Sequence, residues 1–298
     1  MQGNTRQRSA WALRSPSWRK LSINTDPRTT GRGQWLCDGI ALDANHSVLD
    51  IAAGTGDVAL YLASTGHLGR IVASDLVIEM LGATISRGER FGISGVRPVV
   101  CDMEMLSFDS CVFDRVICSM GIMFCGRPEL ALAEAFRVLR PNGKCGYVVW
   151  GDKSANSLPD SVSKALLSHP ATSPFDLDQE RFGMSAPQRL ARGLAEAGFA
   201  DIERREISRS CRYPNSALAP LVRSYLAIHH QSLLRNCSPQ LVDQVVEQAA
   251  ASIEGAGRHG QSELRQLELL FVANKPPRPE NACGTSKAGI HLPDQQGD

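Results

Sequence analysis

The sequence predicts an α/β protein with a largely parallel sheet and helices on both faces. Three observations indicate this fold. Short apolar runs alternate with helical patterns between residues 47 and 150, and a glycine turn directly follows the first run. The composition, with 43% hydrophobic and 21% charged residues, is that of an ordinary globular protein. Because strands that are separated by helices form βαβ units, these strands are expected to pair in parallel.

The first five strands are expected where short apolar runs meet a glycine, an acid or a turn. These runs are residues 47–52, 70–74, 96–101, 113–119 and 144–150. The segments between them show helical spacing, or an acid or a proline in the first turn, and predict helices at residues 57–63, 77–91 and 128–139. The turn Arg-Pro-Asn-Gly at residues 140–143 separates the last of these helices from the fifth strand.

After Trp150 the pattern loosens. Residues 151–185 contain three prolines and no long period, which indicates an insertion or cap segment. A helix is expected at 187–197, a charged alternating strand at 201–208, two amphipathic helices at 216–234 and 239–253, and a last apolar strand at 267–273. Because the two amphipathic helices precede the last strand, we expect a second cap insertion, residues 213–262, to form a lid over a pocket.

The two ends of the chain differ from the core. Residues 1–35 carry seven basic side chains, one acid and three tryptophans. An Arg-rich, acid-poor segment is typical of an organellar transit peptide, whereas tryptophans can anchor an arm on a folded surface, and we favour an ordered arm that covers a ligand. The folded domain is expected over residues 36–274, and the polar, proline-bearing tail 275–298 is expected to be disordered. The tryptophans of the arm are Trp11, Trp18 and Trp35.

Charge and apolar content exclude two classes of protein. Lys and Arg number 32 against 31 Asp and Glu, so no global basic field attracts nucleic acid. No apolar run approaches the roughly 20 residues that a membrane-spanning helix needs. We therefore expect a soluble, cytoplasmic enzyme that acts on a small molecule, with import into an organelle as the alternative. The oligomeric state stays open.

The nine cysteines are odd in number and include no C-x-x-C pair, which argues against a disulfide framework and against a zinc site. No metal is expected, and the thiols are interpreted as buried structural groups in a reducing cytosol. The alternative is a soft-metalloid site, for a ligand such as arsenite, on Cys111, Cys118 and Cys125.

The strongest functional signal is the segment VLDIAAGTGD at residues 48–57, a strand that runs into a glycine turn. Glycines allow the backbone to turn tightly and a ligand to approach its amides. Asp75 closes the second strand, where a carboxylate can accept from both hydroxyls of a ribose. Both features also occur in dinucleotide-binding proteins. Asp102 and Met103 after the third strand separate the classes, because an acid there can accept from an adenine amine while the methionine packs on the ring.

With these residues the sequence resembles the class I S-adenosylmethionine-dependent methyltransferases, and within them the ubiquinone and menaquinone biosynthesis branch. The resemblance covers about residues 45–210, and its motifs are LDIAAGTGD, ASDLVIEML, CDMEMLSF, FDRVICSMGIMF and EAFRVLRPNGKCGYVVWG. It implies a Rossmann-like sheet of seven strands with an antiparallel last strand, and S-adenosyl-L-methionine as the cofactor. The family usually carries a glycine at the position of Ala52.

The resemblance also implies roles for individual residues. Asp50 and 54–56 would hold the methionine part of the cofactor, Asp75 the ribose, Asp102 and Met103 the adenine, and 119–121 the inner side of the cofactor. The complete expected cofactor set is Asp50, Ala52, Gly54, Thr55, Gly56, Asp75, Leu76, Asp102, Met103, Ser119, Met120 and Gly121.

The expected reaction is biosynthetic methylation of a small, mostly apolar or aromatic metabolite at oxygen, nitrogen or carbon. Placing the acceptor in line with the methyl group and excluding water supply most of the catalysis, so no residue is obligatory as a base. His229 and His169 are candidate bases, and Tyr225 and Met123 are candidate acceptor contacts. Two alternatives stay open: an NAD(P)-dependent oxidoreductase, although the chain has no Tyr-x-x-x-Lys, and a catalytically silent cofactor-binding scaffold of the same fold.

Overall fold

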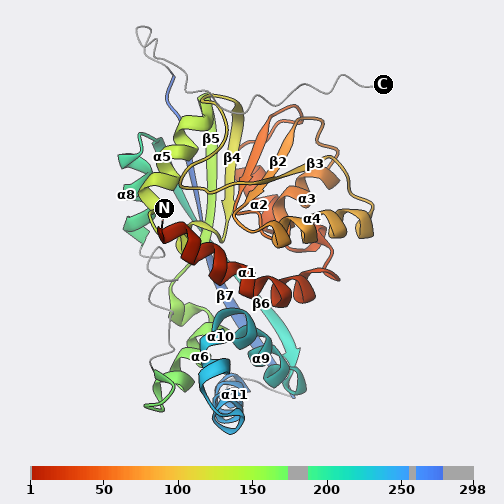
Figure 1. Ribbon diagram of the computed structural model, residues 1–298, viewed down its shortest axis with the longest axis vertical. Coiled ribbons are helices and arrows are strands. Elements are labelled where there is room, and N and C mark those ends of the chain that lie inside the picture. Colours follow the sequence, from red (N-terminus) through yellow and green to blue (C-terminus); the bar gives the residue numbers. More distant parts are fainter. Residues whose placement is uncertain (1, 174–186, 255–259, 278–298) are drawn as a thin grey trace.

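The computed structural model describes residues 2–173, 187–254 and 260–277 (Figure 1). Seven strands form one sheet in the order β3-β2-β1-β4-β5-β7-β6. Neighbours from β3 to β5 pair in parallel, and β7 pairs antiparallel with both β5 and β6. The predicted fold class is confirmed. The strands are β1 (Val48–Ile51), β2 (Ile71–Asp75), β3 (Val96–Val100), β4 (Phe113–Ser119), β5 (Leu139–Trp150), β6 (Ala200–Pro214) and β7 (Gln261–Asn274).

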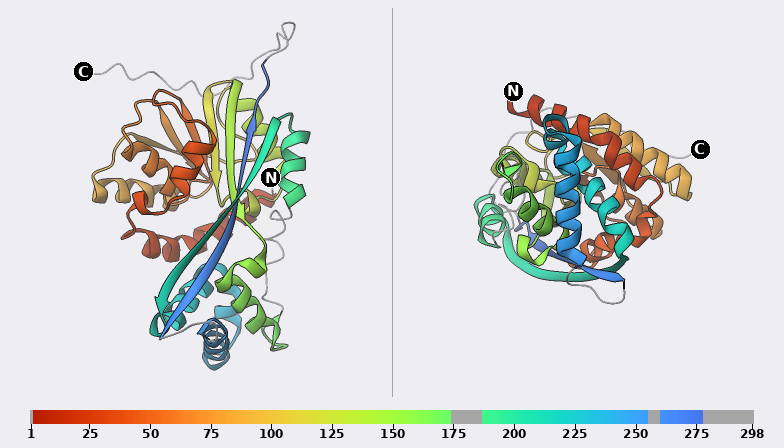
Figure 2. Two further views of the ribbon diagram at one scale, coloured as in Figure 1. Left: turned by 180° about the vertical axis from the view of Figure 1, so that it is seen from behind. Right: turned by 90° about the horizontal axis from the view of Figure 1, so that it is seen from below.

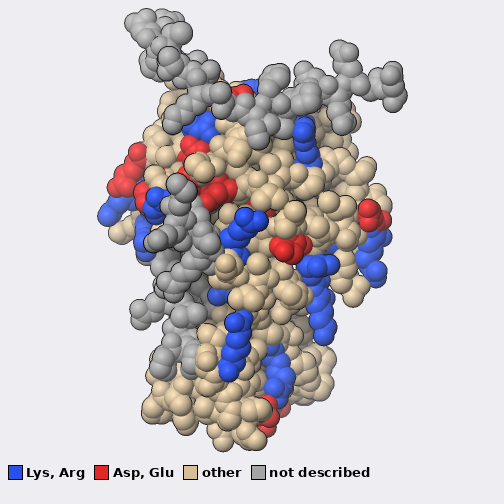
Figure 3. Space-filling view, in the orientation of Figure 1, with Lys and Arg blue, Asp and Glu red and all other residues tan. Residues whose placement is uncertain are grey.

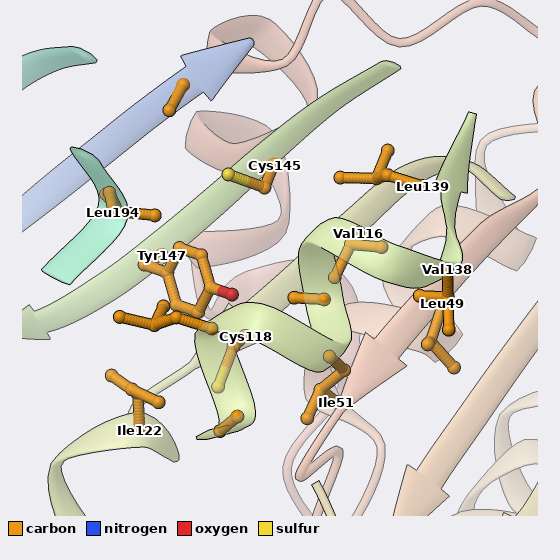
Figure 4. Packing of buried hydrophobic residues seen from close by; sticks show 14 of the residues in the cluster. Leu49, Ile51, Val116, Cys118, Ile122, Val138, Leu139, Cys145, Tyr147 and Leu194 are labelled. Atoms are coloured by element: carbon orange, nitrogen blue, oxygen red, sulfur yellow. The ribbon is translucent and has the colours of Figure 1, made fainter. Parts of the chain in front are cut away.

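Helices cover both faces of the sheet. On one face lie α2 (Arg32–Gly39), α3 (Asp57–Ser64) and α4 (Ile78–Phe91), whose buried side chains meet the strands around Leu36, Val58 and Leu81. The other face carries α5 (Pro128–Val138) and α8 (Pro187–Glu196). Figure 4 shows this second core, in which Tyr147 and Cys118 of the central strands lie among aliphatic side chains. The two layers together fix the carboxyl ends of the parallel strands.

A separate group of helices forms the lid. It consists of α6 (Ser157–Leu167), α9 (Leu218–His229), α10 (Gln231–Asn236) and α11 (Pro239–Glu254), and it lies beyond the sheet at the far ends of β6 and β7 (Figures 1 and 2). These helices have a hydrophobic core of their own, centred on Leu166, Val222 and Val246. The lid is therefore a compact unit carried by two long strands.

Three predictions about this half of the chain were wrong in detail. No helix was expected in the insertion 151–185, yet it contains α6, since Pro159 lies in the first turn, where proline is tolerated. The helix expected over 216–234 is interrupted at His230, which separates α9 from α10. Strands β6 and β7 are longer than expected because they continue to pair with each other beyond the sheet, where their side chains are mostly polar. The part of the predicted cap insertion at residues 174–185 lies outside the described residues.

The predicted N-terminal arm is a regular helix, α1 (Gln2–Ser22), followed by a 3-10 turn, η1 (Pro27–Thr29). Helix α1 crosses between the sheet and the lid and contacts both α4 and α9 (Figure 1). The exposed side chains of α1 include Arg8, Arg19 and Lys20, and Figure 3 shows basic groups along this face of the molecule. In the described ranges, no helix is both long and apolar enough to cross a membrane.

Candidate functional site

A cavity opens at the carboxyl ends of the parallel strands, where α/β sheets bind ligands. The loops after β1, β2, β3 and β4 form its floor, and Gln7, Trp11 and Trp18 of α1 form its roof. Of the twelve residues predicted to contact the cofactor, eleven line this cavity. The exception is Gly56, which lies behind the turn at the start of α3.

The two glycines of the turn after β1 serve different purposes. Gly54 has a φ of +57° and open space around its Cα, so its backbone is accessible from the cavity. Gly56 has a φ of +82°, and a Cβ there would lie 2.4 Å from the methyl carbon of Thr84 on α4. Thr84 also donates a hydrogen bond from Oγ1 to the carbonyl of Gly54, at 3.1 Å. Gly54 thus admits a ligand, and Gly56 allows close packing of α3 and α4.

Ala52 adopts the left-handed conformation with a φ of +54°, as does Met120 after β4 with a φ of +61°. A non-glycine residue in this region costs roughly 1–2 kcal/mol, and such strain concentrates at functional sites. The two loops are also in close contact, because a Cβ on Gly121 would lie 2.6 Å from the Cβ of Ala52. The departure from glycine at position 52 therefore depends on a glycine at position 121.

Asp75 shapes the turn as well as facing the cavity. Its Oδ2 accepts the backbone N–H of Gly54 at 2.9 Å, and its Oδ1 accepts that of Val77 at 2.9 Å. Burial raises the pKa of Asp75, and these backbone hydrogen bonds partly oppose the rise. A carboxylate oxygen can accept more than one hydrogen bond, so each oxygen of Asp75 can also receive a ligand hydroxyl.

Asp50 is a buried carboxyl group at the floor of the cavity. Its Oδ2 accepts the N–H of Ala59 at 3.2 Å, whereas Oδ1 has no hydrogen-bond partner among the described residues. Burial raises the pKa of Asp50 to about 8, and the charges of Asp57 and Asp75 add to the rise. A buried oxygen without a partner is costly, so this one is suited to accept a hydrogen bond from a ligand.

The loop after β3 forms the far end of the cavity, with Asp102, Met103 and Glu104. Asp102 accepts the N–H of Glu104 through Oδ1 at 2.9 Å. Glu104 in turn accepts from Arg127, at 2.8 Å from the side-chain Nε and 3.0 Å from the backbone N–H. Although burial raises the pKa of Glu104, its hydrogen bonds with Arg127 hold that pKa below the ordinary value. The sequence analysis missed Glu104, because its partner lies 23 residues away.

Aromatic side chains form the wall opposite the acids. Trp11 contacts Phe124 edge to face with ring centroids 4.9 Å apart, and Trp18 meets His229 at 6.0 Å. Trp150, at the end of β5, completes this wall. The third tryptophan of the arm, Trp35, packs elsewhere, with the guanidinium of Arg209 4.6 Å above its ring. The N-terminal helix therefore contributes two of its aromatic groups to the cavity.

Three of the residues suggested for the acceptor or for base catalysis lie outside the cavity wall. Tyr225 packs against His229, with ring centroids 4.5 Å apart and the ring planes tilted by 49°, because residues four apart share a helix face. Met123 is 5% exposed and packs in the core, while the adjacent Phe124 takes the cavity position. His169 is exposed beyond α6 and accepts the N–H of Ala171 at 3.1 Å. His229 alone of this group lines the cavity.

Arg87 is fully buried on α4 and donates hydrogen bonds to the glycine turn, to the first turn of α3 and to the segment after α1. Its Nη1 donates to the carbonyl of Thr55 at 2.7 Å and to the carboxylate of Asp57 at 2.5 Å. Its Nη2 donates to the carbonyl of Thr25, just after α1, at 2.7 Å. This arginine therefore connects the glycine turn with the N-terminal segment. No sequence motif marked it.

A second arginine, Arg32 at the start of α2, lines the cavity and forms an ion pair with the buried Glu268 of β7. Burial disfavours the charged form of Arg32, but the carboxylates of Glu268 and Asp57 raise its pKa above the ordinary value. The described residues that line the cavity include five carboxylic acids and one arginine. The acids are Asp50, Asp57, Asp75, Asp102 and Glu104.

The eight described cysteines are all free thiols. Burial raises the pKa of Cys118 to about 12 and also raises that of Cys125, so both remain protonated. Cys111 lies before strand β4 and Cys118 lies near its carboxyl end, so five extended residues separate them. Within the described residues no group of three His, Cys, Asp or Glu side chains is arranged to hold a metal ion, so the metalloid alternative is wrong.

The profile of the family described as "Methyltransferase domain" matches residues 48–143. The Ubiquinone/menaquinone biosynthesis C-methyltransferase UbiE of Cellvibrio japonicus is 36% identical over 202 residues, which cover 62% of this chain and 74% of that protein. The mitochondrial 2-methoxy-6-polyprenyl-1,4-benzoquinol methylase of Caenorhabditis elegans is 30% identical over 124 residues, 41% of this chain and 44% of that protein. The chain thus spans less than half the length of this nematode relative.

Among solved structures, the phosphoethanolamine N-methyltransferase 2 of Haemonchus contortus in complex with S-adenosyl-L-methionine is similar, with a TM-score of 0.55 and 18% identity. The match covers 91% of this chain and 57% of that one. At this level of identity the likeness concerns the fold.

Proposed function

The chain belongs to the ubiquinone/menaquinone biosynthesis branch of the class I S-adenosylmethionine-dependent methyltransferases, and from this premise we propose that it methylates a small, mostly apolar or aromatic metabolite in a biosynthetic reaction. Methylation at oxygen, nitrogen or carbon is compatible with the site. Membership of this family excludes the alternative of an NAD(P)-dependent oxidoreductase.

The observation that carries the proposal is one cavity with two unlike walls. One wall is built from acids and glycine backbone at the ends of β1, β2 and β3. The other is built from the rings of Trp11, Trp18, Phe124, Trp150 and His229. A polar, positively charged cofactor suits the first wall and an apolar acceptor suits the second, so the two ligands would meet between them.

The residues of the acidic wall fit S-adenosylmethionine. Asp50 has a buried oxygen that lacks a partner, and the open backbone at Gly54 forms a cradle that a side chain would fill. In this proposal Asp50 and the glycine turn hold the methionine part, Asp75 accepts from the ribose, and Asp102 with Met103 binds the adenine. When bound, the cofactor supplies a methyl group that is already activated by its sulfonium.

The chain's own contribution is then to position the acceptor and to exclude water. Helix α1 covers the cavity through contacts of Trp11 with Phe124 and of Trp18 with His229. Holding two reactants in line can lower a barrier by several kcal/mol. His229 is the candidate base for an acceptor that must lose a proton, which would add a factor of about 10² to 10⁴. Tyr225 would orient the imidazole ring of His229 through the contact between their side chains.

The test uses S-adenosylmethionine with a labelled methyl group and a panel of hydroquinones, phenols and amines. Transfer of label to an apolar ring compound, together with calorimetric binding of S-adenosylhomocysteine, would support the proposal. Binding of S-adenosylhomocysteine without transfer to the panel or to a metabolite extract would instead favour a catalytically silent scaffold. Tight binding of NAD without binding of S-adenosylhomocysteine would refute the assigned cofactor.

A further inference from the structure

A buried ion cluster joins the start of α2 to strands β6 and β7. Glu268 has 0% side-chain exposure and accepts from Arg32 at 2.6 Å (Nη2) and 3.1 Å (Nε). The same carboxylate accepts from Nη2 of Arg209 at 3.0 Å. One bidentate arginine balances one carboxylate, so the cluster of two arginines and one glutamate has an excess positive charge.

The two arginines differ in what they face. Arg209 donates to the carbonyl of Thr30 at 2.9 Å and stacks on Trp35, away from the cavity. Arg32 lines the cavity, and its side chain is 21% exposed. Within the described residues, the hydrogen bonds of Arg32 use Nε and Nη2, so Nη1 remains available to a ligand. The Nη1 group of Arg32 is therefore the positively charged part of the cluster that a ligand in the cavity can reach.

Apart from Arg32, the charged side chains of the cavity disfavour a bound anion. Five carboxylic acids line it, and among the described lining residues Arg32 is the single arginine or lysine. The ammonium and sulfonium groups of S-adenosylmethionine suit the acids, but its carboxylate needs a cation. A charged group buried without a partner is costly, so the carboxylate must reach Arg32 or remain in solvent.

The position of Arg32 agrees with this requirement. The strand order β3-β2-β1 places Asp102, Asp75 and the glycine turn in a row. Arg32 lines the cavity and is held by Glu268 of β7, which pairs with Trp150 of β5, so it lies on the opposite side of β1 from β3 and its adenine end. On the basis of the proposed function, we propose that Arg32 binds the carboxylate of the cofactor's methionine part through Nη1. Its pairing with Glu268 orients the guanidinium for this contact.

The experiment compares two ligands by isothermal titration. S-adenosylhomocysteine carries the carboxylate, whereas 5′-methylthioadenosine shares the adenosine and thioether but has no amino-acid group. Arg32→Ala should weaken S-adenosylhomocysteine about 10-fold to 100-fold and leave 5′-methylthioadenosine within about twofold. Arg209→Ala is the matched control, because it also removes an arginine from Glu268 but leaves the cavity wall intact. It should leave the ratio of the two affinities unchanged.

The ratio of affinities also separates binding from folding, since a partly unfolded variant loses both ligands equally. An equal loss for both ligands, or no loss for either, would overturn the role of Arg32. If Arg32→Ala does not fold, Arg32→Lys replaces it. A lysine lacks the planar guanidinium and cannot bind two carboxylates at once, so Arg32→Lys should also weaken the binding of S-adenosylhomocysteine alone. Failure of the wild-type protein to bind either ligand would contradict the proposed function itself.

Discussion

Raising the pH from 6 to 8 should tighten the binding of S-adenosylhomocysteine, because of Asp50. Burial raises the pKa of this carboxyl to about 8, so the free protein holds it mostly protonated at pH 6. A ligand ammonium placed against its unpartnered oxygen would favour the ionised form. The ligand then binds best to protein that has lost this proton, and affinity rises as the pH approaches 8.

The magnitude follows from the fraction of ionised Asp50. With a pKa of about 8, that fraction is about 1% at pH 6 and about half at pH 8. If the ligand holds the carboxylate ionised throughout this range, the association constant should increase about 50-fold between the two values. Binding at pH 6 should release nearly one proton per ligand.

Calorimetry in buffers of different ionisation enthalpy measures both the affinity and the proton release. Asp50→Asn is the control, since an amide does not titrate and should give a nearly flat profile at lower affinity. This variant also separates the contribution of Asp50 from that of His229, a second titratable group in the wall of the same cavity. An affinity that is independent of pH in the wild-type protein, or a pH dependence that persists in Asp50→Asn, would refute the reasoning.

Four further outcomes are expected. Asp75→Ala should weaken S-adenosylhomocysteine by about 1.5–3 kcal/mol and also lower the melting temperature of the free protein, because the carboxylate accepts the N–H groups of Gly54 and Val77; calorimetry that finds affinity within twofold of wild type would contradict this. His229→Ala should lower kcat about 10² to 10⁴-fold at unchanged cofactor affinity if His229 is the base, and steady-state kinetics with an unchanged kcat would exclude that role. Hydrogen exchange in residues 7–25 should slow when S-adenosylhomocysteine binds, whereas a transit peptide would exchange fast in both states. Arg87→Met should lower the free energy of unfolding by about 3 kcal/mol, since it removes the donor to the carbonyl of the buried Thr55 and leaves Asp57 without its ion-pair partner, and a denaturant midpoint equal to that of wild type would argue against this.

The alternation of strands and helices, the glycine turn and the acids after β2 and β3 could be predicted because each leaves a local pattern. Strand β4 begins and ends at the residues expected, since its apolar run is bounded on both sides. Helix α1 left no such pattern. Its tryptophans face the cavity while Arg8, Arg19 and Lys20 face solvent, and its position depends on contacts with segments far along the chain.

The residues that the sequence did not reveal act through distant partners. Arg32 and Glu268 are separated by 236 residues, and Arg87 reaches Thr25 across 62 residues. The pattern of a single sequence does not indicate which of its distant charged and polar residues contact each other in the fold. Met123 and Phe124 show a different limit, because which of two adjacent apolar side chains faces the cavity depends on the 3-10 turn at Ile122–Phe124.

Helix α1 is synthesised before every segment that holds it in place. Trp11 contacts Phe124, the carbonyl of Thr25 receives Arg87, and the carbonyl of Leu13 accepts from Gln231 at 2.9 Å. The last of these partners leaves the ribosome more than 200 residues after the helix. Most of the stability of a helix in a protein comes from tertiary packing, and a proline inside α1 weakens it further, so α1 is not stably docked while its packing partners are still untranslated. The cavity therefore acquires its roof only in a late step of folding, and a truncated nascent chain that lacks residue 231 should display the open cavity to solvent.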